Sequence, residues 1–539
     1  MLTERLRCFD VVRDSENLNR ACEILKCGGL VGIPTETVYG LAANCFDETA
    51  VANIFKAKGR PQDNPLIVHI SDMEMLREVV SEVPRKALEL AVKFWPGPLT
   101  IIMPRGEKIP ASVSAGLDTV AVRMPSHPVA RELINRSRLP LAAPSANLSG
   151  SPSPVTAEHV LADLDGRIDA VIMSDQSAVG VESTVVSLCC QPPRLLRPGG
   201  VTVEQLREIL PDLVVDKAVL AEPEKGVPVA SPGMKYKHYA PKARVVLVDA
   251  NLEKFKIFVN NSAGEGIFAL KFEGEDGFNV PTVSFGKRDD ATTQAALLFD
   301  VLRTLDKKNC KICFARVPET KGVGLAVYNR LIRAAAFEVI KLPKIIGLTG
   351  PTGSGKTKLS RIAESRGYSC IDCDKSARVV TEKNSETLKI LAEEFGADIL
   401  MSDGSLDRKR LAKRAFSTPE KTETLNKIML PAIIKVVEKE IFDLVRKGAT
   451  KILLDAPTLF EGGLDAVCDS VVAVLAPMEL RKQRIITRDG LSEEQALVRL
   501  AASKKDEFYK NKTEHIIINN GDLSDFEAQI SSVLVSLED

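Results

Sequence analysis

The chain has 539 residues, 45% of them hydrophobic and 27% charged, so it can bury several cores and form roughly three to four domains. Lysine plus arginine equals aspartate plus glutamate at 72 each, which argues against a global attraction to nucleic acid or a membrane surface. The start, MLTERLRCFD, lacks a basic region followed by an apolar run, and no window approaches about 18 uninterrupted apolar residues, so we expect a cytoplasmic protein. The 11 scattered cysteines favour reduced thiols over a disulfide framework.

The first part of the chain predicts an α/β domain with a twisted, mixed sheet over residues 1–212. Apolar strand-like runs alternate there with helix-like stretches such as DETAVANIFKAK, and the helix TVEQLREIL closes the domain. The strand-like runs include PLTIIMP, TVAVRMP and DAVIMS.

Two further units and a connection follow. Residues 213–242 include AEPEKGVPVASPGMKYKHYAPKA, which is rich in Pro, Gly and Lys, lacks periodicity and predicts a linker. Residues 243–342 begin with the strand RVVLVDA and close with a helix and a strand, which predicts a small Rossmann-like α/β domain. Residues 343–539 carry the strands KIIGLTG, KILLDAP and SVVAVLAP with intervening helices, typical of a parallel sheet, and a helical insertion is expected around 385–445.

Two C-x-x-C pairs have the spacing that a zinc site needs, Cys310/Cys313 and Cys370/Cys373. Each lies in or at the end of a predicted strand, where alternation turns the two sulfurs to opposite faces. We therefore favour buried thiols over zinc.

The stretch GPTGSGKT predicts a phosphate-binding loop between a strand and the helix KTKLSRIAESRG. Its glycines let several backbone N–H groups point at phosphate oxygens at the start of a helix. Lys356 would reach the β- and γ-phosphates, and the Thr357 hydroxyl would bind Mg²⁺. The predicted nucleotide-binding residues of the loop are Gly350, Gly353, Ser354, Gly355, Lys356 and Thr357.

Carboxylates and arginines accompany this loop. Asp372 and Asp374 end the next strand, where a carboxylate can orient or deprotonate an acceptor hydroxyl, so a small-molecule kinase is favoured over a switch GTPase. Arg481, Arg484 and Arg488 lie three and four residues apart on one predicted helix, as a phosphate-clamping lid requires. Taken alone, the stripe is better explained as a solvated helix face.

From about Lys344 onward the chain resembles dephospho-CoA kinase. The motifs GLTGPTGSGKT, IDCDKSAR, LDRKRLAKRAF, LNKIMLPAI, LDAPTLFEGG and RKQRIITRDGLSEEQALVRL occur in that family's order. The resemblance implies ATP-dependent phosphorylation of the 3′-hydroxyl of dephospho-CoA, with Asp374 as catalytic base, Lys356 in catalysis, and Arg484 and Arg488 in the lid. Leu430 stands where the family usually has His and Ser503 where it has Gln, which bears on acceptor binding.

The first half carries its own cluster of candidate residues. Lys56, Lys58 and Arg60 fall within five residues and are followed by Asn64, so either an anion site or a solvated helix end would explain them. Further along, APSANLSG, VESTVVSL and RLLRPG offer hydroxyls, an amide and a cation, including Ser183.

This set resembles the YrdC-like threonylcarbamoyl-AMP synthases in their longer, two-domain form, over about residues 15–342. The motifs PTETVYGL, Lys58-x-Arg60, Ser145-x-Asn147, ESTVV, RPG, SPGMKYKHYAP and GVGLAVYNRLIRAA carry the resemblance. It implies that L-threonine, bicarbonate and ATP give threonylcarbamoyl-AMP and pyrophosphate, with Lys58 and Arg60 in catalysis. The implied ATP-binding residues are Lys58, Arg60, Asn64, Arg123, Ser145, Asn147 and Arg197. The implied threonine-binding residues are Thr35, Tyr39, His69 and Ser183.

The family's product is used by a separate transferase to modify an adenosine beside the anticodon of certain tRNAs. We expect Mg²⁺ to accompany ATP in both halves, and neither a membrane partner nor stable nucleic-acid binding. Residues 231–241 of the linker, with their lysines and aromatics, are interpreted as a lid over the first site; a plain tether is the alternative.

The favoured hypothesis is a bifunctional enzyme. One alternative keeps the synthase but makes the second half a regulatory nucleotide-binding module. Another is an RNA-binding protein that uses the cation-lined cleft near Lys58.

Overall fold

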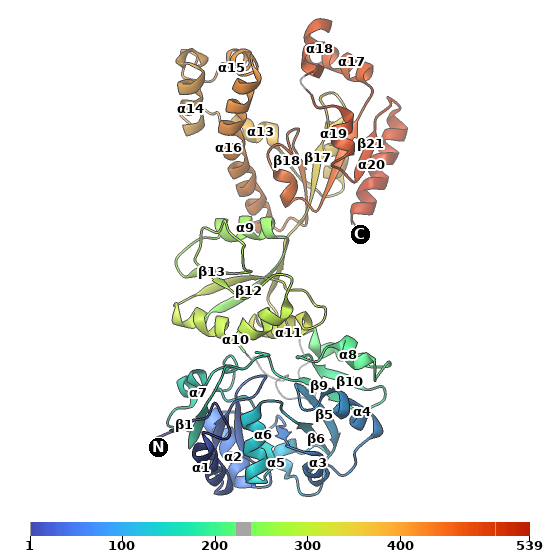
Figure 1. Ribbon diagram of the computed structural model, residues 1–539. Helices are drawn as coiled ribbons and strands as arrows, with labels where there is room; N and C mark the ends of the chain where they lie inside the picture. The colour runs from blue at the N-terminus through green and yellow to red at the C-terminus, as the bar shows by residue number, and fades with distance from the viewer. Residues whose placement is uncertain (1, 222–238, 502, 539) are drawn as a thin grey trace. The chain divides into compact units, whose positions relative to one another are not determined.

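The computed structural model describes residues 2–221, 239–501 and 503–538, which form two compact units (Figure 1). Unit 1 comprises Met1–Asp249 and Ala263–Ile340, and unit 2 comprises Ala250–Ser262 and Lys341–Asp539. Most of the predicted lid lies outside the described residues. Within the described part of the chain, no helix has the length and apolar character needed to span a bilayer.

Unit 1 contains an 11-stranded mixed sheet, which confirms the predicted sheet type. Its strand order is β1-β8-β2-β3-β7-β4-β6-β5-β9-β10-β11, and it contains both parallel pairs, such as β5–β9, and antiparallel pairs, such as β5–β6. Its strands are β1 (Glu4–Arg7), β2 (Val31–Ile33), β3 (Gly40–Asn44), β4 (Ile67–His69), β5 (Leu99–Pro104), β6 (Thr119–Arg123), β7 (Leu141–Ala142), β8 (Ala170–Met173), β9 (Thr184–Ser187), β10 (Arg194–Arg197) and β11 (Val214–Val215). Its helices are α1 (Ser15–Lys26), α2 (Glu48–Lys58), α3 (Met73–Val79), α4 (Arg85–Phe94), α5 (Ala111–Ser114), α6 (Pro128–Ser137), α7 (Ala157–Leu164) and α8 (Val203–Arg207).

Helix α2 shows how local sequence places a site residue. Asp47 caps its N-terminus by accepting hydrogen bonds from the backbone N–H groups of Thr49 and Ala50. Gly59 ends it in the left-handed region, at φ +59°, which favours glycine. Helix α2 therefore ends at Lys58, and the chain turns sharply toward Arg60.

Unit 1 also contains a five-stranded sheet of the order β14-β13-β15-β12-β16. The pairs β12–β15, β13–β15 and β13–β14 are parallel, which agrees with a Rossmann-like domain. The strands are β12 (Arg244–Asp249), β13 (Ile267–Lys271), β14 (Thr282–Ser284), β15 (Ile312–Arg316) and β16 (Val339–Lys341), and the helices are α10 (Ala291–Lys307) and α11 (Gly324–Ala334).

Cys310 and Cys313 are buried free cysteines, as favoured from the sequence. Cys310 precedes β15, whereas Cys313 lies within it. The neighbouring Cys313 thiol lowers the pKa of Cys310.

Unit 2 is built on the five-stranded sheet β18-β19-β17-β20-β21, whose pairs are all parallel, as predicted. Its strands are β17 (Lys344–Thr349), β18 (Ser369–Asp372), β19 (Lys451–Asp455), β20 (Ser470–Leu475) and β21 (His515–Ile518). Its helices are α9 (Leu252–Asn261), α12 (Lys356–Ser365), α13 (Cys373–Val379), α14 (Glu386–Phe395), α15 (Arg408–Ala415), α16 (Pro419–Arg446), α17 (Met478–Asp489), α18 (Glu493–Ala501), α19 (Asp506–Lys510) and α20 (Leu523–Glu538). Helices α14 to α16 occupy the predicted insertion.

Helix α9 belongs to unit 2 although it precedes β13 and β14 in the sequence. The Lys254 ammonium, almost fully buried, lies 2.7 and 2.8 Å from the two carboxylate oxygens of Asp469. Asp469 also accepts the backbone N–H of Ile345 at 2.7 Å. Ile257 joins the same core cluster as Ile345 and Val437. The core of unit 2 thus draws on a segment that lies some 80 residues before its first strand, counted from Lys344.

Candidate active sites

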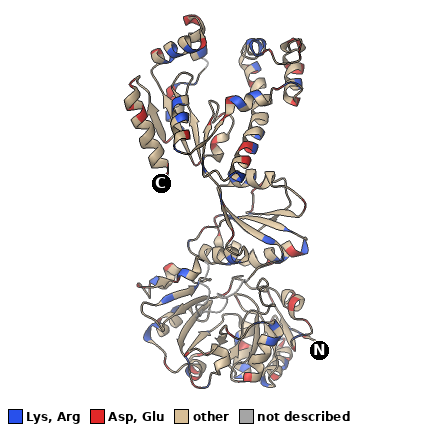
Figure 2. Ribbon diagram, turned by 180° about the vertical axis from the view of Figure 1, so that it is seen from behind, with Lys and Arg blue, Asp and Glu red and all other residues tan. Residues whose placement is uncertain are grey.

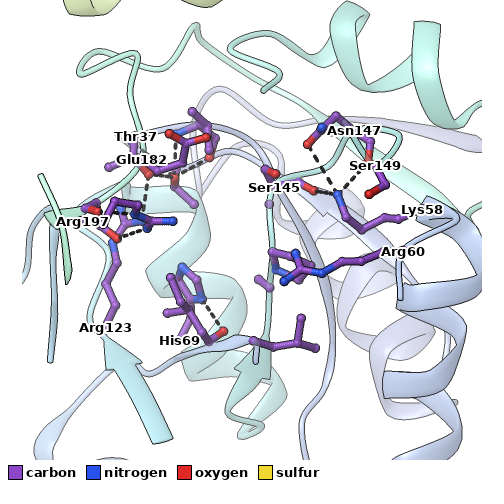
Figure 3. Close-up of a pocket in the computed structure, with 18 of the residues that line it drawn as sticks. Thr37, Lys58, Arg60, His69, Arg123, Ser145, Asn147, Ser149, Glu182 and Arg197 are labelled. Carbon is purple, nitrogen blue, oxygen red and sulfur yellow. Dashed lines mark hydrogen bonds between the residues drawn. The ribbon is translucent and has the colours of Figure 1, made fainter. Parts of the chain in front are cut away.

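A pocket in unit 1 gathers nearly all the site residues predicted for the first half of the chain (Figure 3). They come from the end of α2, from strands β4, β6 and β10, and from the loops after β2, β7 and β8. Those that line it are Thr35, Lys58, Arg60, His69, Arg123, Ser145, Asn147, Ser183 and Arg197. Four cations and several hydroxyls therefore converge on one cavity, which is the composition of a phosphate-binding site.

Lys58 is buried and holds a loop in place. Its ammonium donates to the backbone carbonyls of Ser145 and, at 2.6 Å, Asn147. Burial and, less strongly, Arg60 lower the pKa of Lys58 well below its usual value. An anion in the pocket would raise that pKa again, because it would stabilise the charged form.

Arg60 is held less completely than Lys58. One guanidinium nitrogen donates at 3.3 Å to the carbonyls of Asn64 and Pro65, and Nε is buried without a hydrogen-bond partner among the described residues. Burial lowers its pKa to about 10. A buried guanidinium with unused donors is prepared for an anionic ligand.

Arg123 and His69 form another side of the pocket. Arg123 donates to Thr37 Oγ1 at 2.8 Å and forms an ion pair with the Glu36 carboxylate at 2.7 Å. Burial and then Arg123 lower the pKa of His69 to about 3, so this imidazole is neutral near pH 7. His69 can therefore donate or accept a hydrogen bond but adds no charge.

Ser183 and Arg197 form a compact hydrogen-bonded pair. Arg197 donates from Nε to the Ser183 carbonyl at 3.0 Å and from Nη2 to Ser183 Oγ at 3.1 Å. The Ser183 hydroxyl also lies 2.7 Å from that of Thr100. Each residue thereby fixes the direction of the other.

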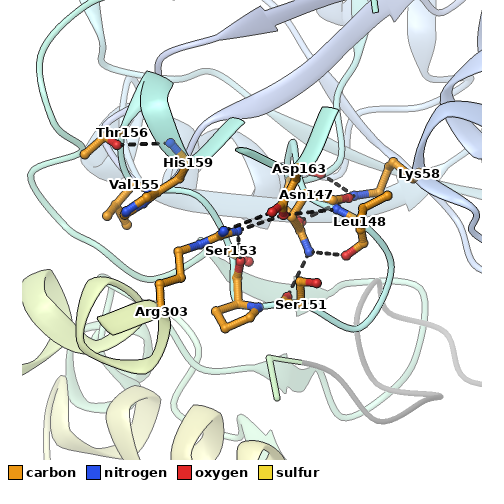
Figure 4. A network of polar contacts seen from close by, with 12 residues as sticks. Lys58, Asn147, Leu148, Ser151, Ser153, Val155, Thr156, His159, Asp163 and Arg303 are labelled. Atoms are coloured by element: carbon orange, nitrogen blue, oxygen red, sulfur yellow. Dashed lines mark hydrogen bonds and ion pairs between the residues drawn. The ribbon is translucent and has the colours of Figure 1, made fainter. Parts of the chain in front are cut away.

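The loop that Lys58 contacts is anchored from outside the pocket as well (Figure 4). Arg303 of α10 makes a bidentate ion pair with Asp163, at 3.0 and 2.9 Å. Asp163 in turn accepts the backbone N–H of Leu148 at 3.3 Å. The side chain of Asn147 donates to the carbonyls of Leu148 and Ser151, so the Ser145–Ser151 turn is fixed on both sides.

Two predicted residues are placed differently from the rest. The Tyr39 hydroxyl donates to the carbonyls of Ser174 and Asp175 and is not among the lining residues. Asn64 is buried beside Arg60, and its side-chain amide has no hydrogen-bond partner among the described residues. Thr37 and Glu182 line the pocket but were not predicted as site residues, although they lie within the motifs PTETVYGL and VESTVVSL. Tyr239, from the segment interpreted as a lid, lines the pocket as well.

A second pocket, in unit 2, has a volume of about 610 Å³, within the range typical of nucleotide-sized ligands. Predicted residues that line it are Gly353, Gly355, Lys356, Thr357, Asp374, Arg484 and Arg488. Gly350 and Ser354 instead support the loop from behind: the Gly350 carbonyl accepts Lys356 Nζ at 2.8 Å, and the Ser354 carbonyl accepts Asn519 Nδ2 at 2.9 Å. Leu430 and Ser503 do not line this pocket.

Two arginines of α17, Arg481 and Arg484, contact the phosphate-binding loop directly. Arg484 donates to the carbonyl of Gly353 at 3.1 Å and to the side chain of Asn519 at 3.0 Å. Arg481 donates to the carbonyl of Thr352 at 3.0 Å. Arg488 lines the pocket, and its guanidinium donates a hydrogen bond to the Asp489 carboxylate. The arginine stripe on α17 therefore faces the loop rather than solvent alone.

Asp455, at the end of β19, is a site residue that the sequence reasoning missed. Burial raises its pKa to about 6, against the opposing effect of Lys356. Its Oδ2 accepts from Ser360 at 3.2 Å, while Oδ1 is buried without a hydrogen-bond partner in the described part of the chain. A buried carboxylate oxygen without a partner, beside the Thr357 hydroxyl in one pocket, fits a divalent cation.

Comparisons with known proteins find relatives of both parts of the chain. The family described as "Telomere recombination" matches residues 23–199, "Threonylcarbamoyl-AMP synthase, C-terminal domain" matches 201–336, and "Dephospho-CoA kinase" matches 344–525. The threonylcarbamoyl-AMP synthase of Pyrococcus abyssi is 44% identical over 332 residues, which cover 60% of this chain and 95% of the relative. The dephospho-CoA kinase of Bacillus licheniformis is 34% identical over 190 residues, 35% of this chain and 94% of the relative. The crystal structure of P. abyssi Sua5 complexed with L-threonine is 40% identical, with a TM-score of 0.59, covering 64% of this chain and all of that one.

The two pockets, one lined by four cations and the other formed around a phosphate-binding loop, define a transferase with two nucleotide sites. The chain belongs to the threonylcarbamoyl-AMP synthase family through its first part and to the dephospho-CoA kinase family through its last.

Proposed function

We propose that this chain is a bifunctional enzyme that makes threonylcarbamoyl-AMP in unit 1 and phosphorylates dephospho-CoA in unit 2. The convergence of Lys58, Arg60, Arg123 and Arg197 on one pocket with Ser145, Asn147 and Ser183 carries the first assignment. The phosphate-binding loop with Asp374 and Asp455 in one pocket carries the second.

The unit 1 chemistry needs charge stabilisation more than a protein nucleophile. L-threonine and bicarbonate supply a carbamate, which attacks the α-phosphorus of ATP and expels pyrophosphate. Negative charge then develops on the α-phosphate and on the departing group, where the pocket's cations are available. We assign Thr35, His69 and Ser183 to the threonine and the four cations, with Ser145 and Asn147, to ATP.

The unit 2 chemistry is phosphoryl transfer. Asp374, at the N-terminus of α13, is assigned the role of accepting the proton of the acceptor hydroxyl. Lys356 and the α17 arginines Arg484 and Arg488 stabilise charge on the transferred phosphoryl group. The alternatives, a regulatory module or an RNA-binding protein, gain no support, and Lys and Arg are interspersed with Asp and Glu over both units (Figure 2).

Mg²⁺ belongs to the proposal for both sites. In unit 2, Thr357 and Asp455 would hold it, and it would neutralise charge on the β- and γ-phosphates. In unit 1 the carboxylates Glu36 and Glu182 are each paired with an arginine, so we propose that the nucleotide's own phosphates hold the ion there. The adenylate is proposed to pass to a separate transferase that modifies tRNA.

Two assays on the same preparation test the proposal. With ATP, Mg²⁺, bicarbonate and L-threonine, pyrophosphate release should depend on threonine. With ATP, Mg²⁺ and dephospho-CoA, CoA should form in the wild type and be lost in Lys356→Ala and Asp374→Asn variants. If wild-type protein that binds ATP forms no CoA, unit 2 does not phosphorylate dephospho-CoA, and the departures at Leu430 and Ser503 would account for an altered acceptor site.

A further inference from the structure

Arg330, in α11, is the largest fully buried side chain of the described structure. A guanidinium cannot lose its hydration unless other groups replace it. Its Nε donates to Glu182 Oε2 at 2.8 Å, Nη2 to the Glu182 carbonyl at 3.4 Å, and Nη1 to Asn329 Oδ1 at 2.8 Å. All three guanidinium nitrogens therefore donate hydrogen bonds, and two of them, Nε and Nη2, donate to Glu182.

Glu182 is itself part of the pocket wall in unit 1. Its second carboxylate oxygen accepts a hydrogen bond from the buried Ser153 hydroxyl, so both oxygens are occupied. Burial alone would raise the pKa of Glu182, but Arg330 and then Arg197 lower it, and the group stays ionised. The next residue along the chain is Ser183, which Arg197 contacts through two nitrogens.

Arg330 also contacts a second residue of the pocket wall, the aromatic ring of Tyr239. Its guanidinium carbon lies 5.6 Å from the centre of the Tyr239 ring, within cation–π distance, and Tyr239 lines the same pocket. Arg330 thus contacts two lining residues from behind while it does not line the pocket itself.

We propose that Arg330 is a positioning residue of the synthase site: it neutralises Glu182, so that Glu182 does not draw Arg197 away from Ser183 and from the phosphates of ATP. This inference rests on the proposed function of unit 1. Without Arg330, the strongest remaining partner for the buried Glu182 carboxylate is Arg197, and a captured Arg197 binds phosphate less well. The small Rossmann-like domain would therefore supply a group on which the nucleotide pocket depends.

The test compares Arg330→Gln, Glu182→Gln and the double variant in threonine-dependent pyrophosphate release by the full chain. We expect Arg330→Gln to raise KM for ATP about tenfold or more. The double variant has no buried charge to capture Arg197, so its KM should return to within about threefold of wild type. A role in folding alone would lower the amount of active enzyme, hence the apparent kcat, without raising KM.

Asp300→Asn is the matched control, because Asp300 of α10 pairs with His159 at 3.3 Å and touches no lining residue through that pair. Its KM for ATP should match wild type, and CoA formation by unit 2 should be unchanged in every variant. If Arg330→Gln does not fold, Arg330→Lys keeps the charge but loses the paired contacts, and a KM raised about threefold is expected.

Two results would overturn the inference. One is an unchanged KM for ATP in a folded Arg330→Gln or Arg330→Lys variant, and the other is a double variant no better than Arg330→Gln. A wild-type chain that releases no pyrophosphate with threonine contradicts the proposed function instead, so the two failures are distinguishable.

Discussion

At the scale of single residues, Arg60 and Lys58 divide the work of the unit 1 pocket. The Lys58 ammonium donates to the carbonyls of Ser145 and Asn147, whereas Arg60 Nε has no hydrogen-bond partner among the described residues. The structure therefore favours Arg60 as the main contact to phosphate and Lys58 as the residue that fixes the loop.

We expect Arg60→Ala to lower kcat/KM for pyrophosphate release by about 10²-fold, because a charge-stabilising donor is lost, with little change in thermal stability. Lys58→Ala should lower both activity and melting temperature, since the loop loses its anchor. Lys56→Ala is the control, because Lys56 is exposed on the same helix and does not line the pocket. Equal activity of the Arg60→Ala and Lys56→Ala variants would show that Arg60 has no such role.

Substitution of Asp455 should affect stability and activity in opposite directions. Its pKa is raised to about 6 in the folded state, so ionising Asp455 destabilises that state. The free energy of unfolding therefore falls as the pH rises from the unfolded-state pKa near 4 to about 6. Asp455→Asn removes that penalty. At pH 7.5 the variant should gain about 1–3 kcal/mol in free energy of unfolding, and the gain should vanish near pH 4.

The same Asp455→Asn variant should form CoA slowly and require more Mg²⁺, because the amide has no charge to offer the ion. Chemical denaturation of the full chain, followed by a signal from unit 2, gives the stability at each pH. Asp443→Asn, on α16 and outside the pocket, is the control. A variant with no gain at pH 7.5 would contradict the raised pKa.

The residues that the sequence could predict were those in contiguous motifs, such as Lys58-x-Arg60 and the phosphate-binding loop. Asp455 lies in the motif LDAPTLFEGG but was not predicted as a site residue, because its role depends on burial and on Lys356, which is 99 positions away in the sequence. Tyr39 lies in a matched motif, yet its hydroxyl is engaged by Ser174 and Asp175, which only the fold brings to it.

At the scale of elements, the strand–loop–helix of unit 2 depends on backbone that only glycine adopts easily. Gly350 has φ +135°, and a Cβ there would lie 2.2 Å from the carbonyl oxygen of Val474. The sequence predicted this loop well, because its glycine spacing reflects a local requirement of the backbone. Side-chain burial within α17 and the direction of its arginines needed the three-dimensional structure.

We expect Gly350→Ala to abolish CoA formation and to lower the free energy of unfolding of unit 2 by more than about 2 kcal/mol, from backbone strain plus the clash. Gly367→Ala is a matched control: it also has positive φ, at +85°, but a Cβ there meets open space. That variant should lose only about 1 kcal/mol and retain kinase activity. Similar losses in both variants would mean that the close approach to Val474 is unimportant.

At the scale of the whole molecule, the sequence predicted a boundary between residues 342 and 343. The compact units divide close to it, between Ile340 and Lys341, and unit 2 also includes residues 250–262. A sequence pattern could not indicate this, because α9 has the apolar face of any amphipathic helix and its partner is set by tertiary packing, here through Ile257.

Ile257→Ala should therefore weaken unit 2. Removing a buried isoleucine side chain from a core typically costs about 2–5 kcal/mol, so CoA formation should be lost at a lower temperature than in wild type. Lys256→Ala is the control, because Lys256 lies on the same helix and forms its ion pair with Glu253 of that helix. Thermal inactivation identical to wild type would show that α9 contributes little to the kinase fold.

The position of α9 also affects how a cell could manage the two activities. A break between residues 340 and 341, by gene fission or by a protease, would separate the kinase from Lys254 and Ile257, so Asp469 would lose its lysine partner. Such a cut would therefore separate the two activities only at the cost of a less stable kinase. Synthesis and turnover of the two activities should accordingly stay matched one to one for the lifetime of each molecule.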